Sequence, residues 1–139
     1  MQIPGLDIAA AADDLPWRAT RDAGIYWLPL HLDETPPDSD AGAEGGKPAK
    51  RGAASVLIRM EPGRGYAAHR HVGSEDVLVL AGGYRDAQGT YRAGEHVYYP
   101  PGSEHAPCAL GDVERPIGPD NPACVLFSVV PEGIELLDR

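Results

Sequence analysis

Hydrophobic residues in this chain occur in short runs, each bounded by glycine, proline or acidic residues. Runs rich in β-branched and aromatic residues, separated by turn-forming residues, are typical of β-strands. The clearest of them cover residues 25–32, 53–60, 76–80, 95–99 and 124–130. Short strands with turn signals between them predict an all-β sandwich or barrel.

Two stretches lack this pattern and are predicted to lie outside the main strands. Residues 1–24 are interpreted as an N-terminal extension, in which 15–23 is the candidate for one short helix. Apart from its prolines, the segment 33–52 contains no apolar side chain larger than alanine, so we expect a flexible surface loop there. Because 139 residues suffice for one hydrophobic core, residues 25–139 are predicted to form a single domain.

Composition favours strands over helices and narrows the range of partners. The 17 glycines and 14 prolines interrupt regular backbone too often for a helical bundle. The formal net charge of -9 comes without any basic run that would neutralise phosphates, so we expect no nucleic-acid partner. No apolar stretch approaches membrane-spanning length and the opening residues lack the basic segment of a secretory signal. We therefore expect a cytoplasmic protein that does not contact a membrane.

The two cysteines do not form a recognisable metal or redox motif. Cys108 and Cys124 are too far apart in the sequence for a CxxC pair. We interpret both as buried free thiols in a reducing compartment. A disulfide between them stays open as an alternative.

Four residues carry nitrogen and oxygen donors of the kind that divalent metals prefer: His69, His71, Glu75 and His105. Residues two apart in a strand project from the same face, so both imidazoles of the first pair can point at one centre. A turn before Glu75, and a rigid proline-rich turn before His105, can bring the other two side chains there. Any one of these histidines alone would more often be an ordinary surface or core residue. Together they predict one divalent metal ion per chain, with one or two coordination positions open to a small molecule.

The spacing of these residues resembles the first sequence motif of the cupin family. The match covers every fixed position, as Gly63-x5-His69-x-His71-x3-Glu75-x6-Gly82. The resemblance implies a single-domain double-stranded β-helix, the jelly-roll barrel of the cupins, with the metal inside the barrel.

The second cupin motif matches nearly as well, as Gly94-x5-Pro100-x-Gly102-x2-His105. The asparagine that the family has four positions after the histidine is Ala109 here. Because that asparagine is not a ligand, its loss leaves the predicted metal site intact. The short interval between the two motifs predicts a tight hairpin near residues 86–89.

Within the cupins, residues 68–86 and 89–105 are most similar to the cupin domain of ChrR-type anti-sigma factors and to acetylacetone-cleaving dioxygenases. The first relatives imply zinc held by three histidines and one glutamate, in a domain attached to a helical sigma-binding module. We find no such module in this sequence and do not expect a direct anti-sigma role. The second relatives imply iron(II) held by three histidines, and the presence of Glu75 departs from that set.

Two functions follow from these resemblances. The first is a metal-dependent dioxygenase-type oxidoreductase, with Fe2+ acting on an oxygen-bearing small molecule such as a β-diketone. The alternative is a non-catalytic zinc-binding sensor or regulatory cupin. The same ligands would also suit Mn2+ or Ni2+.

Three residues are candidates for catalysis. Glu75 could leave the metal and act as a base, and Arg59, in an otherwise apolar run, could anchor an anionic or carbonyl substrate. The alternative for Arg59 is an ion pair with a carboxylate on the outer face of its strand. Tyr98 is the third candidate, because strand alternation points either it or Tyr99 into the barrel.

The remaining histidines, His31 and His96, are predicted to lie on the outside of the protein. The exposed-looking aromatic run at 25–32 is the candidate for an edge strand that pairs two chains into a homodimer.

Overall fold

The computed structural model describes residues 14–33, 49–50, 53–132 and 134–136, of which 49–50 and 134–136 are described by their backbone alone. These residues form thirteen strands and no helix. The strands are β1 (Arg18–Ala19), β2 (Ile25–Leu32), β3 (Ala49–Lys50), β4 (Ala54–Met60), β5 (His69–His71), β6 (Glu75–Ala81), β7 (Gly83–Asp86), β8 (Gly89–Arg92), β9 (His96–Tyr99), β10 (Glu104–His105), β11 (Cys108–Ala109), β12 (Cys124–Val130) and β13 (Ile134–Leu136). Within this part of the chain, no helix has the length and apolar character needed to cross a membrane.

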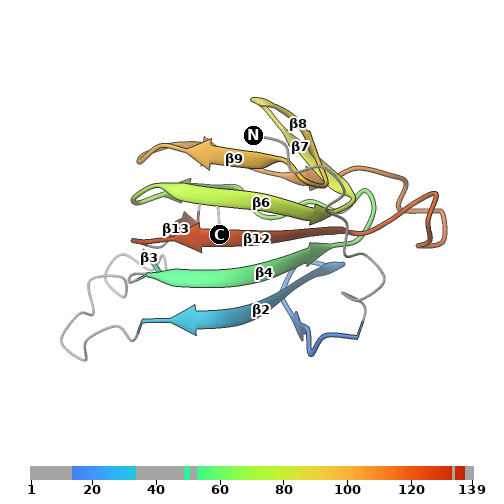
Figure 1. The fold of residues 1–139 in the computed structure, drawn as a ribbon, viewed down its shortest axis with the longest axis horizontal. Coiled ribbons are helices and arrows are strands. Elements are labelled where there is room, and N and C mark those ends of the chain that lie inside the picture. The colour runs from blue at the N-terminus through green and yellow to red at the C-terminus, as the bar shows by residue number, and fades with distance from the viewer. Residues whose placement is uncertain (1–13, 34–48, 51–52, 133, 137–139) are drawn as a thin grey trace.

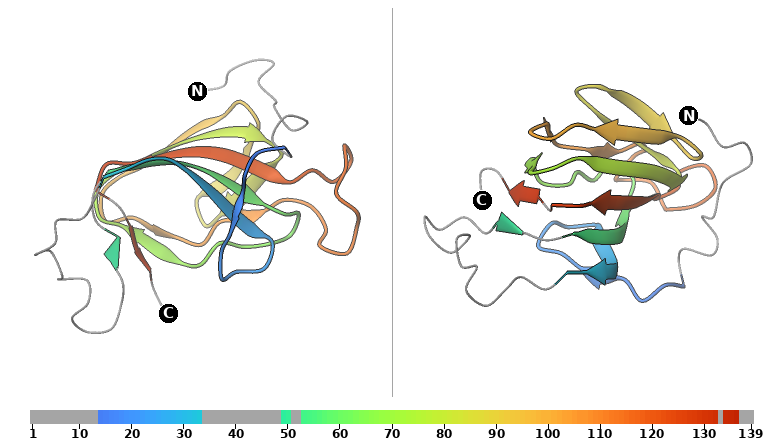
Figure 2. Two further views of the ribbon diagram at one scale, coloured as in Figure 1. Left: turned by 90° about the horizontal axis from the view of Figure 1, so that it is seen from below. Right: turned by 60° about the vertical axis from the view of Figure 1, so that its left-hand side comes forward.

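The strands form three antiparallel sheets. The largest has the order β1-β2-β4-β12-β6-β9, and Figure 1 shows most of its strands side by side across one layer. A second sheet has the order β10-β5-β13-β3, and a third the order β11-β7-β8. In the left view of Figure 2, the large sheet and the chain around β5 and β10 enclose the interior from opposite sides. The all-β prediction is therefore confirmed.

The long strands match the predicted hydrophobic runs closely, and alternation along them decides what faces the interior. In β6 the buried positions are Glu75, Val77, Val79 and Ala81, while the residues between them are only partly buried. Ser128 of β12 is also buried and pairs in register with Val77. One acidic and one hydroxyl side chain thus share the inner face with the aliphatic residues of the core.

The hydrophobic core fills the space between the sheets. Its buried members are Ile25, Met60, Val77, Val79, Tyr84, Val97, Tyr99, Ala109, Cys124 and Leu126. Both cysteines are free, so the structure excludes the disulfide alternative. Cys124 is buried, and burial raises the pKa of its thiol to about 12, whereas Cys108 is only partly buried.

The glycines of the two sequence motifs occupy turns with left-handed backbone. Gly63, Gly82, Gly94 and Gly102 all have φ between 62° and 91°. At Gly82 the chain also packs tightly, because a Cβ added there would lie 2.5 Å from the carbonyl oxygen of Ala123. Glycine is therefore favoured at these motif positions, because the turns at the ends of the strands that carry the predicted ligands need left-handed backbone.

The N-terminal part of the structure differs from the prediction. Residues 15–23 form no helix, and Arg18–Ala19 instead pairs with β2 as strand β1. A turn at Gly24, with φ of 75°, and a hydrogen bond from Thr20 N to Ile25 O close this pairing. The large sheet therefore begins before the predicted domain boundary at residue 25.

The predicted loop at 33–52 lies mostly outside the described residues. Its Ala49–Lys50 segment forms β3, paired with β13. Backbone pairing needs no apolar side chains, so composition gave no signal for this strand. Along β2, Leu30 and Leu32 are exposed, and the homodimer through this strand stays a prediction.

Replacing Gly82 by alanine should destabilise the protein more than replacing Gly102. Both glycines have left-handed backbone, for which a Cβ costs about 1–2 kcal/mol, but nothing lies within 4 Å of a Cβ added at Gly102. We expect Gly82→Ala to lose at least about 1 kcal/mol more free energy of unfolding than Gly102→Ala. Urea denaturation of both variants measures the difference, and equal losses would contradict the close contact with Ala123.

Candidate metal centre

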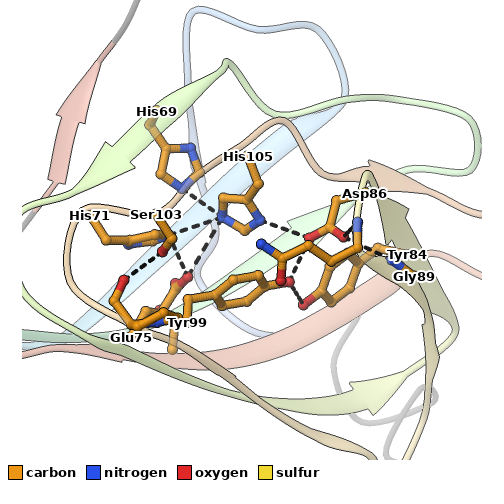
Figure 3. Close-up of polar contacts among 12 residues, drawn as sticks. His69, His71, Glu75, Tyr84, Asp86, Gly89, Tyr99, Ser103 and His105 are labelled. Atoms are coloured by element: carbon orange, nitrogen blue, oxygen red, sulfur yellow. Dashed lines mark hydrogen bonds and ion pairs between the residues drawn. The ribbon is translucent and has the colours of Figure 1, made fainter.

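The four predicted ligands come together inside the barrel. His69 and His71 are buried on one face of β5, with exposed Arg70 between them. Glu75 is the first residue of β6, and His105 ends β10, where it pairs in register with His69. One ligand atom from each of these four residues, here called the ligand cluster, lies within 4.8 Å of all the others. Figure 3 shows the rings and the carboxylate facing one another.

Short turns place these side chains. After Pro100, a turn closes with a hydrogen bond from Ser103 N to Pro100 O. His71 N then donates to Ser103 O at 2.9 Å, and Gly102 N donates to His71 O at 2.8 Å. These backbone bonds hold β10 against β5 and return His105 to the interior, as the proline-rich sequence predicts.

The distances within the ligand cluster are short. His105 Nε2 lies 2.9 Å from His69 Nε2 and 3.0 Å from His71 Nε2. Glu75 Oε1 lies 2.9 Å from His71 Nε2 and 3.6 Å from His105 Nε2. Neighbouring ligands bound at ~2.1 Å to one small divalent ion lie roughly 3.0–3.4 Å apart. The printed distances are close to this spacing, so the four groups can surround a single ion.

Hydrogen bonds at the other ring nitrogens assign the tautomers of two histidines. His69 Nδ1 lies 2.9 Å from the carbonyl oxygen of Ala67, and His105 Nδ1 lies 3.0 Å from Asp86 Oδ2. Both partners are acceptors, so both Nδ1 atoms carry the proton and both Nε2 atoms present lone pairs.

The two Nε2 atoms lie 2.9 Å apart, and in these tautomers neither of them carries a proton. Glu75 Oε1 is buried and lies 2.9 Å from His71 Nε2 and 3.6 Å from His105 Nε2. Electron pairs so close repel one another unless a positive charge lies between them. The residues present thus fit a divalent cation.

Burial sets protonation states that suit metal binding. Burial lowers the pKa of His69 to about 4, with a further lowering by the nearby His105. Burial also lowers the pKa of His105, against the opposing effect of Asp86. For Glu75, burial raises the pKa, but the His71 ring and the Ser128 hydroxyl outweigh it and the net shift is downward. At neutral pH the cluster presents neutral imidazoles at these two positions and an ionised carboxylate.

Ser128 orients the carboxylate of Glu75. Its hydroxyl donates a short hydrogen bond to Glu75 Oε2, and its side chain is buried in β12. This leaves Oε1 directed toward the ring nitrogens of the cluster. Ser128 was not predicted from the sequence. A single polar residue at an inward position of an apolar strand does indicate a buried hydrogen bond.

Tyr98 points away from the ligand cluster, so the structure gives no support for it as a catalytic candidate. Its side chain is 53% exposed, because β9 points Val97 and Tyr99 inward. Tyr99 takes the inner position instead. Its ring stacks on His71 at 5.6 Å between centroids and lies 4.3 Å from that of His105.

Arg59 does not point into the barrel, and the structure gives no support for its role as a substrate anchor. Its neighbours Ile58 and Met60 belong to the core side of β4, so alternation directs Arg59 to the other face. There its guanidinium lies 3.4 Å from Glu61 and 5.7 Å above the ring of Tyr26. The alternative of an outer-face ion pair is the one observed.

The other histidines lie outside the site, as predicted. His31 and His96 are exposed, and each forms a contact of 2.8 Å with a neighbouring aspartate, Asp33 or Asp76.

Residues 48–114, which include the whole ligand cluster, match the family model of the ChrR cupin-like domain. Among solved structures, an RmlC-like cupin protein from Ralstonia eutropha JMP134 is 21% identical, with a TM-score of 0.62 over 91% of this chain and 69% of that chain. The chain has the cupin fold. This confirms the resemblance and the fold class expected from the two sequence motifs.

Two further structures similar to this cupin carry functional names. A chain in the crystal structure of Rhodobacter sphaeroides SigE in complex with the anti-sigma ChrR is 23% identical, with a TM-score of 0.58 over 85% of the cupin and 49% of that chain. The cupin therefore spans about half the length of that relative. An acetylacetone dioxygenase from Acinetobacter johnsonii is 14% identical, with a TM-score of 0.60 over 84% of the cupin and 66% of that chain. No curated protein sequence matches the cupin.

The metal-free cupin should lose stability as the pH falls from about 6.5 to about 4. His69 has a pKa of about 4 in the folded protein against 6.5 for an unperturbed histidine, so within this window the unfolded chain binds a proton that the folded protein does not. This one group accounts for a loss of about 3 kcal/mol. Chelator-treated protein, unfolded in urea at several pH values, measures the change.

In the same titration, His69→Gln should flatten the pH profile, because it removes the titrating ring. Exposed His96 is the matched control, and His96→Gln should retain the wild-type slope. Parallel profiles for wild type and His69→Gln would contradict the assignment.

Proposed function

We propose that this cupin binds one divalent metal ion through His69, His71, Glu75 and His105. The observation that carries the proposal is the approach of His69 Nε2 and His105 Nε2 to 2.9 Å, beside a buried oxygen of Glu75 that lies 2.9 Å from His71 Nε2. Neutral imidazoles with one carboxylate are ligands that Fe2+, Zn2+, Mn2+ and Ni2+ all accept.

The first candidate activity is that of a metal-dependent dioxygenase-type oxidoreductase acting on an oxygen-bearing small molecule such as a β-diketone. Four protein ligands leave one or two positions on a five- or six-coordinate ion, and Fe2+ bound there would supply sites for dioxygen or a substrate oxygen. The similarity in fold to the acetylacetone dioxygenase supports this candidate.

The protein's own residues would position and shield the reacting groups. Ser128 holds one oxygen of Glu75, so the other oxygen is the one available as ligand or base. Tyr99 packs on His71, and Tyr66 lies edge-on to His69 with centroids 5.2 Å apart. These apolar ring surfaces limit the access of bulk water to the centre.

The second candidate is a zinc-binding sensor or regulatory cupin without catalysis. It is supported by the match of residues 48–114 to the ChrR cupin-like domain and by the retention of Glu75 beside three histidines. The deep burial of the ligand cluster suits a stable zinc site equally well.

Stoichiometric metal should disappear when two ligands are removed together. We expect wild-type protein, purified without added metal, to contain about one divalent ion per chain by elemental analysis. The double variant His69→Ala with His105→Ala should contain almost none, because only two ligands remain. A matched control replaces the two exposed histidines, His31 and His96, and should keep the wild-type content. Undiminished metal in the first variant would refute the site.

Oxygen consumption separates the two candidate functions. After reconstitution with Fe2+ under nitrogen, the oxygenase candidate should consume dioxygen on addition of a β-diketone or a catechol-like compound. The His69→Ala, His105→Ala variant should show no more uptake than buffer containing the same iron. Tightly bound zinc in the isolated protein, with no oxygen uptake after iron reconstitution, would reject the oxygenase and favour the regulatory cupin.

A further inference from the structure

A buried carboxylate outside the ligand cluster contacts one of its histidines. Asp86 ends β7 at the hairpin between the two sequence motifs, and its side chain is 0% exposed. Its Oδ2 accepts hydrogen bonds from Tyr99 Oη at 2.6 Å and from His105 Nδ1 at 3.0 Å. Its Oδ1 accepts backbone bonds from Gln88 N and Gly89 N in the hairpin turn. Figure 3 shows Asp86 on the far side of His105 from the rings of His69 and His71.

The hairpin turn alone does not explain this arrangement. A turn aspartate needs one oxygen for the backbone N–H groups and ordinarily leaves the other in water. Here the second oxygen is buried as well, and burial without partners would be costly for an ionised group. Burial raises the pKa of Asp86, but the bonds from Tyr99 and His105 outweigh it and the net shift is downward.

Two tyrosines hold Asp86 in place from behind. Because Tyr99 Oη donates to Asp86, it accepts from Tyr84 Oη at 2.7 Å. Both tyrosine side chains are fully buried in the core. The carboxylate therefore has one position available, and His105 meets a fixed acceptor.

We propose that Asp86 is a positioning residue that holds His105 with its proton on Nδ1 and its Nε2 lone pair aimed at the metal. The inference rests on the metal binding proposed above. Without the carboxylate, a neutral imidazole is free to carry its proton on Nε2, where it cannot bind a metal, or to rotate away. A carboxylate on the outer nitrogen also makes the imidazole a more basic ligand. Asp86 thereby couples the β7–β8 hairpin to the metal centre.

The test compares Asp86→Ala with Asp112→Ala. Asp112 is a matched control, because its Oδ1 accepts a backbone bond from Glu114 N in another turn and contacts no member of the ligand cluster. Zn2+ affinity is measured by competition with a chromophoric chelator. We expect Asp86→Ala to bind Zn2+ about 10–100-fold more weakly than wild type. Asp112→Ala should bind as wild type does.

A second readout follows the His105 ring directly. In metal-free, 15N-histidine-labelled protein, long-range 1H–15N spectra report which ring nitrogen is protonated. Wild type and Asp112→Ala should show His105 protonated on Nδ1, and Asp86→Ala should lose that preference. A role confined to the hairpin turn would lower stability while leaving both the His105 tautomer and the Zn2+ affinity unchanged, and that result would overturn the proposal.

The two proposals fail in distinguishable ways. If wild-type protein binds no Zn2+, the metal site fails. The tautomer comparison in metal-free protein then still tests the bond between Asp86 and His105. If Asp86→Ala does not fold, the wild-type spectrum alone decides, since a His105 protonated on Nε2 would overturn the positioning role.

Discussion

The rest of the structure depends on one constraint. The fold buries the lone pairs of several candidate metal-ligand side chains close to a single point inside the barrel. Lone pairs of His69 and His105 meet there without a proton between them, and one oxygen of Glu75 faces the same point. In a low-dielectric interior such an arrangement is unfavourable unless a cation compensates it. The surrounding sheets, turns and hydrogen bonds hold the donors in this arrangement. The repulsion between these buried lone pairs therefore favours a bound metal ion.

Position and orientation of the ligands come from different parts of the fold. Backbone pairing between β5 and β10 sets the positions of His69, His71 and His105, and the start of β6 sets that of Glu75. Orientation comes from single contacts behind three of the ligands. These are the Ala67 carbonyl, the Asp86 carboxylate and the Ser128 hydroxyl. A backbone carbonyl is supplied by any sequence, whereas the other two contacts depend on specific residues.

This division explains what could be predicted from the sequence. The ligands and main strands follow from local rules, because the two-residue period of a strand and the proline-rich turn before His105 are visible in the sequence. The inward choice of Tyr99 over Tyr98 was not predictable, since both are aromatic and the phase of β9 depends on its pairing with β6. Asp86 resembles an ordinary turn residue, and its contact with His105 exists only once distant strands meet. The pairing of Arg18–Ala19 with β2 is local in sequence, but a strand this short has too few positions to show an alternating pattern.

The two candidate functions share the ligand cluster, so access to it distinguishes them physically. An oxygenase must admit a small molecule to an open coordination position, whereas a structural or sensing zinc site gains from exclusion of solvent. The ring of Tyr99 covers His71, and that of Tyr66 covers an edge of His69. Tyr99 is held by its bond to Asp86, and Tyr66 is partly buried and packs against the core. Whether these rings leave a coordination position open to a small molecule is therefore the physical property on which the two candidate functions differ.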